Sequence, residues 1–527
     1  MRKIISLFFV FTLCGALIWP GSASAAIDDQ GAAGLKKLVE NELQGRLGMT
    51  KITGQGLVTE GAVAVTPKPA FYEVKIPGLS LSFGPQGKLD IGMVVINAVP
   101  GKAGEWMTSV ALPATMTLYE KPDIAVASIS LGSQGCKGAW LPAQGIYPRF
   151  DCLYKDILIK GTGADDFKIA LGSLKMIANL KSNSDGTLSG QGGFEAGDVK
   201  IDADGKDALQ LNVQKINVTS IYDRLDLSRE MEIRKKILDA ALTGAPPADE
   251  QSAALLGGLM SLTGAMPENL SNSVEAGGIV VRTKNLAQPN QPMEEFSLDK
   301  AAFQSTLKNM RQTVSSAAVK GGFNGIKLSP ANASLASLMP NALNIDMSMD
   351  NIPLKKISAM MYDTLQQMIW ALKTTPKSPA DAKNLTENQL NSLLASLPRI
   401  LQNAGASLSI QNTFIKSNEM EAALTGRIQA NTIASSGITG KLTLSVNGLE
   451  NVIQKLQAMA VKPLADGKIN TYANGLTALS VMGEADKTAD GKLIHNYVFE
   501  ITDDNKILLN NMNLQPLLAP GVTPQPK

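Results

Sequence analysis

Apolar and polar residues alternate along much of the chain, and one arrangement of them recurs. A Gly-Gly-Phe motif occurs at 192–194 and again at 321–323, and an alternating apolar run follows each copy. The first run ends at Ile216 and the second at Ile352, in each case after a gap of two residues. A third run ends at Leu449 and follows a weaker echo of the motif at 424–428. This recurrence predicts a strand–turn–strand–helix module that is used repeatedly.

The three runs place their apolar residues at every second position, so each run has one apolar face. We interpret this face as a candidate groove for an apolar ligand. Its nine positions are Leu209, Leu211, Val213, Ile345, Met347, Met349, Leu442, Leu444 and Val446.

Period-two alternation also dominates residues 53–219. Tyr72, Val74 and Ile76 alternate with polar neighbours, and turn signals such as Pro100-Gly101 separate this run from similar ones. Successive antiparallel strands with one apolar face form a sheet that buries that face. The predicted fold class is therefore α+β and β-rich, with long curved antiparallel sheets built from the repeated modules and with covering helices.

Apolar residues at helical spacing predict several helices. An amphipathic helix within 26–52 has its stripe at Leu35, Leu38, Val39, Leu43 and Leu47, and both a packed helix and a lipid-surface helix fit this pattern. Further helices are expected over 228–242 and 249–262. Two more are expected over 354–372 and from 386 to the glycine at 405.

These patterns divide the chain into consecutive parts. We predict a signal peptide over 1–25, the amphipathic helix over 26–52 and a β-rich module with trailing helices over 53–275. A second module covers 276–383, a third with a closing hairpin covers 384–515, and a disordered tail covers 516–527.

The first 25 residues have the features of a secretory signal. A basic start at Arg2 and Lys3 precedes an apolar stretch from Ile4 to Trp19, and small residues end at Ala25. The alternative is an uncleaved segment that anchors the protein in the inner membrane. Cleavage is favoured because the apolar stretch is short for a membrane span. The expected location is therefore the periplasm, with the protein either soluble or peripheral to the membrane.

Charge and cysteine content narrow the function classes. Removal of Arg2 and Lys3 with the signal leaves 47 basic residues against 47 acidic ones, and this balance argues against nucleic acid as a partner. Cys136 and Cys152 are the two cysteines that then remain. An even number of cysteines in an oxidising compartment favours a disulfide, and two buried thiols are the alternative.

Motifs for catalysis or cofactor binding are missing from the sequence. The single histidine, His495, lies in a predicted strand and has no nucleophile motif to serve. Zinc-ligand spacing, a phosphate loop and a dinucleotide fingerprint are also missing. We therefore expect no enzyme activity, no cofactor and no metal. A hydrolase with an unrecognised carboxylate site stays as a remote alternative.

Some segments resemble a known group of envelope proteins. The leading helix, the run Tyr72 to Pro77 and the run Ile129 to Gln134 with Gly138-Ala139-Trp140 carry the resemblance. The order of features is similar to that of uncharacterised alphaproteobacterial envelope proteins with domains of unknown function. Those proteins in turn resemble the YdgA-like and AsmA-like periplasmic proteins. The resemblance implies an elongated β-rich periplasmic protein with a hydrophobic groove that handles lipids, and it carries over no functional residues.

The leading hypothesis is a non-enzymatic periplasmic protein that binds or transfers lipid, or another apolar ligand, along a curved sheet groove. The alternative is a structural or protein-interaction role in the envelope, with the sheets covered by their own helices. Expected partners are accordingly a lipid or membrane surface, or other envelope proteins. The two hypotheses differ in whether helices such as 354–372 fill the apolar face.

Overall fold

The computed structural model describes residues 27–53, 55–121, 124–141, 146–162, 167–203, 209–227, 267–284, 294–329, 337–374, 379–431, 434, 437–460, 467–487, 491 and 493–515. The expected signal peptide (1–25), the helices expected over 228–242 and 249–262, and the tail (516–527) lie outside the described residues. The chain forms two compact units, Met1–Met293 and Glu294–Lys527. The sequence-based boundaries at 275/276 and 383/384 stay predictions.

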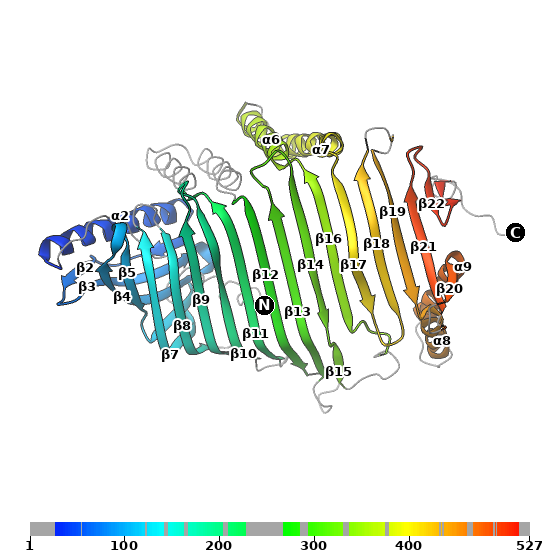
Figure 1. Ribbon diagram of the computed structural model, residues 1–527. Coiled ribbons are helices and arrows are strands. Elements are labelled where there is room, and N and C mark those ends of the chain that lie inside the picture. The colour runs from blue at the N-terminus through cyan, green and yellow to red at the C-terminus, as the bar shows by residue number, and fades with distance from the viewer. Residues whose placement is uncertain are drawn as a thin grey trace. The chain divides into compact units, whose positions relative to one another are not determined.

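Unit 1 combines one described α-helix with an antiparallel sheet (Figure 1). Its elements are α2 (Asp29–Thr53), β1 (Gln55–Val58), β2 (Ala64–Pro67), β3 (Tyr72–Phe83), η1 (Gly84–Gln86), β4 (Lys88–Pro100), η2 (Lys102–Gly104), β5 (Trp106–Ala111), β6 (Thr115–Lys121), β7 (Ile124–Leu141), β8 (Ile146–Gly161), β9 (Phe167–Ser182), β10 (Leu188–Ala203), β11 (Leu209–Leu225) and β12 (Asn269–Thr283).

Unit 2 continues with strands and two pairs of helices. Its elements are β13 (Glu294–Lys308), β14 (Ser315–Asn324), β15 (Lys327–Ser329), β16 (Ala342–Ile352), α6 (Leu354–Thr374), α7 (Pro379–Ala404), β17 (Ser407–Lys416), β18 (Glu421–Ala430), β19 (Ile438–Asn447), α8 (Leu449–Ala460), α9 (Gly467–Met482), β20 (Glu484–Lys487), β21 (Leu493–Ile501), β22 (Ile507–Leu509) and β23 (Met512–Asn513).

Each strand pairs mostly with its neighbour in the chain, and all described pairings are antiparallel. In unit 1 the order from β3 to β12 is a continuous meander, with β5 and β6 together filling one strand position between β4 and β7. In unit 2, β14 and β15 share one position beside β13. The predicted β-rich α+β fold with antiparallel sheets and repeated strands is confirmed.

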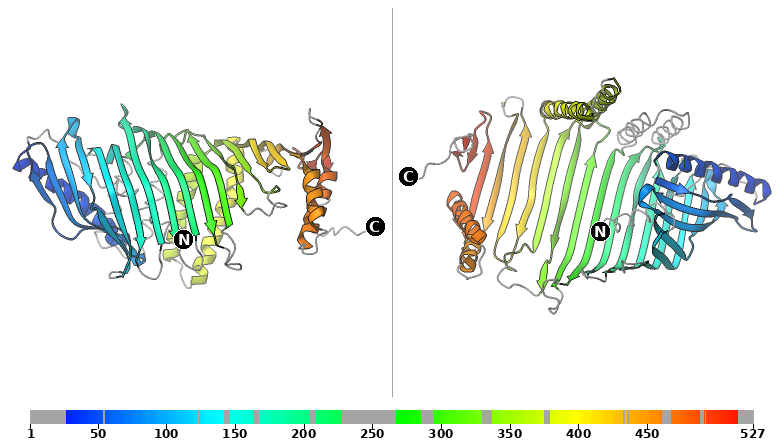
Figure 2. Two further views of the ribbon diagram at one scale, coloured as in Figure 1. Left: turned by 90° about the horizontal axis from the view of Figure 1, so that it is seen from below. Right: turned by 180° about the vertical axis from the view of Figure 1, so that it is seen from behind.

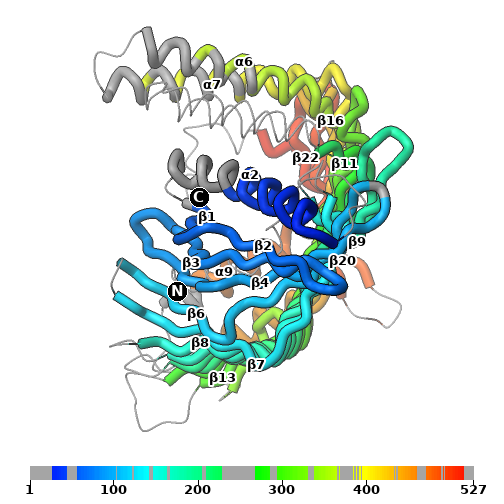
Figure 3. Tube along the Cα trace, turned by 90° about the vertical axis from the view of Figure 1, so that its left-hand side faces the viewer, coloured from blue at the N-terminus to red at the C-terminus, as the bar shows by residue number. Residues whose placement is uncertain are grey.

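Helix α2 packs onto the apolar face of the unit-1 sheet (Figure 3). Leu35, Val39 and Leu43 are buried together with Tyr72 and Trp140 in one hydrophobic core. The hydroxyl of Tyr72 also accepts a hydrogen bond from the backbone N–H of Asp28 (3.1 Å), just before the helix begins. These contacts agree with the packed-helix interpretation of the amphipathic pattern.

The long strands of unit 1 keep their apolar residues on one face through single left-handed residues, at which the pairing register does not shift. In β8, Ile157 and Ile159 are buried, and beyond Asp156 the buried positions change phase to Tyr154 and Cys152. Asp156 has φ 52°, in the left-handed region that short polar residues tolerate. Asp198 in β10 has the same φ of 52°. A strict period of two would have moved half of each strand's apolar residues to the other face.

The Gly-Gly-Phe motifs lie within β10 and β14, and the second glycine of each motif has the same structural role. A Cβ atom on Gly193 would lie 2.0 Å from the carbonyl oxygen of Val218 on β11. A Cβ atom on Gly322 would lie 2.0 Å from the carbonyl oxygen of Leu343 on β16. Only glycine permits such close backbone approach, so each motif lets two neighbouring strands lie close together at this point.

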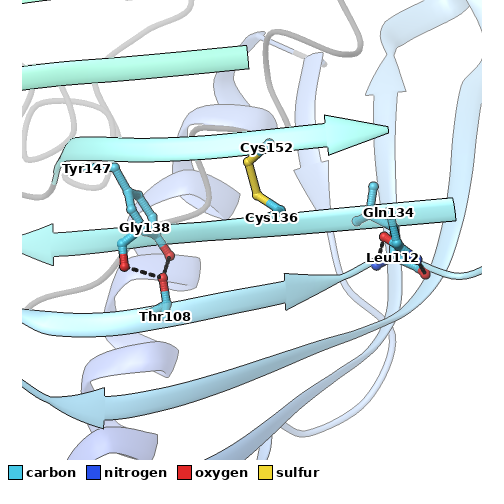
Figure 4. The surroundings of a disulfide bond; sticks show 7 residues. All are labelled: Thr108, Leu112, Gln134, Cys136, Gly138, Tyr147 and Cys152. Atoms are coloured by element: carbon cyan, nitrogen blue, oxygen red, sulfur yellow. Dashed lines mark hydrogen bonds between the residues drawn. A yellow bond between two sulfur atoms is a disulfide. The ribbon is translucent and has the colours of Figure 1, made fainter. Parts of the chain in front are cut away.

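The predicted disulfide joins Cys136 and Cys152, which lie directly opposite each other on β7 and β8 (Figure 4). The two cysteines flank Trp140 in the sequence, and this position predicts that the bridge ties the base of a loop between two strands. Both strands instead continue well past the cysteines, to Leu141 and from Ile146. The bridge therefore cross-links the interior of a two-strand ladder.

Between the end of β5 and the start of β6, a side chain near the disulfide supplies the hydrogen bonds that a neighbouring strand's backbone would otherwise make. The amide of Gln134 accepts a hydrogen bond from the Leu112 N–H (2.9 Å) and donates one to the Leu112 carbonyl (2.6 Å). Both backbone groups would otherwise lack a partner at this break. Nearby, the Thr108 hydroxyl lies 3.0 Å from the Tyr147 hydroxyl, and burial raises the pKa of Tyr147 to about 12 (Figure 4).

A polar cluster ties together the ends of β10, β11 and β12. Arg224 lies within hydrogen-bond distance of Asp185 (2.8 Å) and Glu268 (3.2 Å). The Thr187 hydroxyl donates to Asp185 as well (2.6 Å). Hydrogen bonds from Thr187 and Arg224 hold the pKa of the Asp185 carboxyl well below its usual range.

We predict that Gly193→Ala destabilises unit 1 by about 1–3 kcal/mol or more, because the added methyl group overlaps a backbone oxygen. The matched control is Gly135→Ala on β7, where a Cβ atom meets nothing within 4 Å. Urea unfolding should show a lower midpoint for Gly193→Ala and a midpoint close to wild type for the control. Equal midpoints for the two variants would refute the close-approach role.

The disulfide encloses a segment of about 15 residues, for which the chain-entropy model gives about 3 kcal/mol of stabilisation. Reduction should therefore lower the urea midpoint of unit 1. The Cys136→Ala/Cys152→Ala double variant should unfold at the same urea concentration with and without reductant. If reductant leaves the wild-type midpoint unchanged under conditions where thiol titration confirms reduction, the bridge contributes nothing to stability.

Asp185 should make unit 1 more stable at neutral pH than in acid. Its folded-state pKa lies below its unfolded value of about 3.9, so its contribution is complete above pH 5 and is lost as the pH falls through the lower folded value. Asp185→Asn should thus unfold more easily than wild type at pH 7, and this difference should shrink below pH 4. A difference that is constant from pH 7 to pH 2.5 would contradict the assignment.

Candidate functional site

The strand registers of unit 2 gather its apolar residues on one face of the sheet, which we call the unit-2 apolar face. Residues directly opposite one another in antiparallel strands point to the same side. One row of opposed residues runs across five strands and consists of Leu307, Ala317, Met349, Leu408 and Ile428. The next row consists of Ser305, Val319, Met347, Ile410, Gly426 and Leu442.

A third row begins with Phe303, Gly321 and Ile345. The fourth begins with Ala301, Phe323 and Leu343. Towards the far edge the same face includes Leu424 and Leu444, which are opposed on β18 and β19. Apart from Ser305, the named members of the rows are apolar or glycine.

The opposite face of the same strands is polar. Gln304, Lys320 and Asp346 form one cross-strand row there, in which the Lys320 ammonium lies 3.1 Å from the Asp346 carboxylate. A second row includes Thr306, Ser348 and Ser409. This separation is typical of a sheet with one face in water and one face against other apolar groups.

The unit-2 apolar face is only partly covered by the described part of the chain. Phe303 is 48% exposed and Val319 is 36% exposed. Ile415 of β17, which lies opposite Leu343 in the fourth row, is also exposed. The other large apolar residues of the rows on β13–β18 are half-buried. The second row crosses six strand positions and the others fewer, so the four rows lie within an area of about 20 by 24 Å, or roughly 500 Å² in all. Monomeric proteins seldom expose contiguous apolar patches larger than a few hundred Å².

Helices α8 and α9 cover one edge of the unit-2 apolar face. Val446 and Tyr497 are buried with Leu449 and Ile453 of α8 in a second hydrophobic core, and Leu476 and Leu479 of α9 pack against it. The Tyr497 hydroxyl donates a hydrogen bond to the Leu479 carbonyl (2.8 Å). Burial, and then the charge of Glu450, raise the pKa of Tyr497.

His495 belongs to this closed edge. Its side chain is buried on β21, and its Nε2 forms a short hydrogen bond with the Glu450 carboxylate at the start of α8. Its Nδ1 has no hydrogen-bond partner among the described residues. His495 therefore connects α8 to the sheet, 45 residues away along the chain. No nucleophilic side chain is paired with it in the contacts described.

Helices α6 and α7 lie at the ends of the strands and not over the middle of the sheet (Figure 1). α7 contacts β16 and β18, whereas α6 packs mainly against α7. The buried residues Ile352 and Ile400 mark the junction with the sheet. The described part of the helix expected over 354–372 therefore does not fill the unit-2 apolar face.

The nine residues of the predicted groove fall into three different environments. Leu209 is half-buried on β11, Leu211 packs against the unit-1 core, and Val213 is only 7% exposed within that core. Ile345, Met347 and Met349 lie on the unit-2 apolar face and are half-buried. Leu442 and Leu444 lie on the same face nearer α8, and Val446 is buried beneath that helix.

Several residues of the face were not singled out from the sequence. Leu408 and Ile410 alternate with polar neighbours on β17, whereas Phe303, Val319 and Phe323 on β13 and β14 each have an alanine or glycine on one side. The period-two signal was therefore clear on β17 and weaker on β13 and β14. What the sequence could not supply is the cross-strand register that brings these residues together.

The described residues contain no group of three or more metal-ligating side chains, and none of the helices described in them is long and apolar enough to span a bilayer. No family model, no curated protein and no solved structure matches the chain. The candidate site is therefore defined only by the residues and geometry of this chain.

Proposed function

We propose that the protein binds the acyl chains of lipids on the unit-2 apolar face and acts as a non-enzymatic protein of the cell envelope. The observation that carries this proposal is the apolar sheet face, within an area of roughly 500 Å², that unit 2 leaves partly exposed among the described residues. Its rows of aliphatic, methionine and aromatic side chains suit flexible apolar chains, because they supply contact area without directional polar groups.

The two units differ in a way that favours unit 2 as the binding site. In unit 1, α2 and neighbouring strands cover the apolar face as far as β11, as the burial of Leu35, Val39 and Val213 shows. Only on β12 does this cover thin out, where Val274 is 41% exposed. In unit 2 the corresponding cover from α8 and α9 reaches only the strands near β19 and β21.

A location outside the cytoplasm has two supports. The first is the signal-like pattern of residues 1–25, and the second is the Cys136–Cys152 disulfide, which persists in oxidising compartments. In the periplasm, a protein that shelters acyl chains would carry or hold lipid without spanning a membrane.

The test replaces one residue on each face of the same strand. Met347→Lys places a charge in the centre of the unit-2 apolar face, and the matched control Ser348→Lys places it one residue away on the polar face. Burying an unpaired charge against an acyl chain is strongly unfavourable. We expect Met347→Lys to weaken binding of a fluorescent fatty acid at least tenfold and Ser348→Lys to leave it close to wild type.

Circular dichroism and urea unfolding would establish that both variants keep the fold. Equal affinity of the two folded variants, or no saturable binding by the wild-type protein, would rule out the unit-2 apolar face as an acyl-chain site.

A further inference from the structure

The α6–α7 pair is attached to the unit-2 sheet at a narrow base. α6 begins directly after β16 and α7 ends directly before β17, so both junctions lie at the same end of neighbouring strands. Asn351 at the first junction has φ 56° and Gly405 at the second has φ 64°. The Asn351 side-chain amide donates a hydrogen bond to the Gly405 carbonyl (3.2 Å). Two left-handed residues, linked to each other, therefore flank the whole pair.

The two helices pack on each other more than on the sheet. The Ser396 hydroxyl of α7 lies 2.9 Å from the Met360 sulfur of α6. The buried residues described in the pair, Pro353 and Ile400, lie close to its base. Farther out, the apolar side chains of Met361 and Leu394 are 39% and 52% exposed. In the contacts described, the pair meets the sheet at β16 and β18, next to its attachment, and we call the pair the α6–α7 arm.

The arm projects on the side of the apolar face. In the left view of Figure 2, the yellow-green helices α6 and α7 and the orange helices α8 and α9 extend to the same side of the unit-2 sheet. α8 and α9 cover apolar residues of that face, including Val446 and Leu444. The arm therefore stands at the strand ends, on the same side as the part of the face that α8 and α9 leave open.

The dimensions of the arm match the surface below it. α6 has 21 residues and would span about 31 Å at 1.5 Å per residue. The facing strands have 10 or 11 residues and span about 33–37 Å. An arm that tilts at its base towards the sheet would cover the strands over most of their length, with an apolar residue such as Leu394 approaching the uncovered rows.

We propose that the α6–α7 arm is a lid that closes over the unit-2 apolar face when acyl chains occupy it. Closure would enclose the chains between the sheet and the arm, and would remove both apolar surfaces from water. Asn351 and Gly405 would act as the hinge, since hinges are a few residues at element ends that absorb changes in φ and ψ. This inference rests on the proposed function of the same face.

Paired spin labels can follow the lid directly. One label is placed at Leu394→Cys on the arm, and the other at Asn324→Cys, at the strand end remote from the hinge. The control pair, Lys308→Cys with Asn324→Cys, lies entirely within the sheet. Cys136 and Cys152 are joined in the disulfide, and a Cys14→Ser background leaves no other thiol to label.

Distances are measured by double electron–electron resonance before and after addition of oleate, with oleate binding measured on the same labelled proteins. We expect a new population of shorter Leu394–Asn324 distances in the presence of oleate and an unchanged Lys308–Asn324 distribution. Binding of oleate without any change in the Leu394–Asn324 distances would overturn the lid while leaving the proposed function intact. Absence of oleate binding would overturn the proposed function and the lid with it.

Discussion

The burial of one apolar face by each sheet is the constraint on which the rest of this structure depends. Long antiparallel strands with period-two alternation produce an apolar face and a polar face. The apolar face is stable only when it packs against other apolar groups and not against water. Unit 1 meets this requirement from its own chain as far as β11, through α2 and the strands that precede β7. Unit 2 does so only beside α8 and α9. The proposed function follows from that difference in cover.

Apolar and polar residues stay on separate faces along the long strands because local irregularities in the backbone shift the alternation where it is needed. Asp156 and Asp198 have left-handed backbone conformations, and the alternation of buried and exposed positions changes phase at each of them. Gly193 and Gly322 let neighbouring backbones approach where a side chain would collide. Gln134 supplies hydrogen bonds where the β5–β6 position is interrupted. Without such devices a twisted sheet of this length would lose its register and mix its faces.

Much of this fold could be predicted from the sequence, because strand alternation, helix stripes and cysteine pairing are local signals. The Gly-Gly-Phe repeat, the disulfide and the β-rich class are of this kind. The burial of each face could not be predicted in the same way. Val213 and Met349 occupy equivalent positions in similar runs, yet one is buried in a core and the other is half-buried. Their difference arises from distant segments that pack on one run and not on the other.

The contact between His495 and Glu450 shows the same limit. The alternation around His495 predicts a strand, and the structure has one, but nothing local indicates that its imidazole holds a helix against the sheet. The groove residues divide for the same reason. Those near β16 stay on an open face, and those near β11 and at the end of β19 lie in or against cores formed with segments that the pattern alone could not place.

Native mass spectrometry of the protein isolated from cells without detergent tests the central claim most directly. The account predicts a fraction of molecules with the added mass of one or more lipids, and predicts that Met347→Lys loses this fraction while Ser348→Lys keeps it. Recovery of the folded wild-type protein entirely without bound lipid, or of lipid equally in both variants, would contradict the assignment of the unit-2 apolar face as an acyl-chain site.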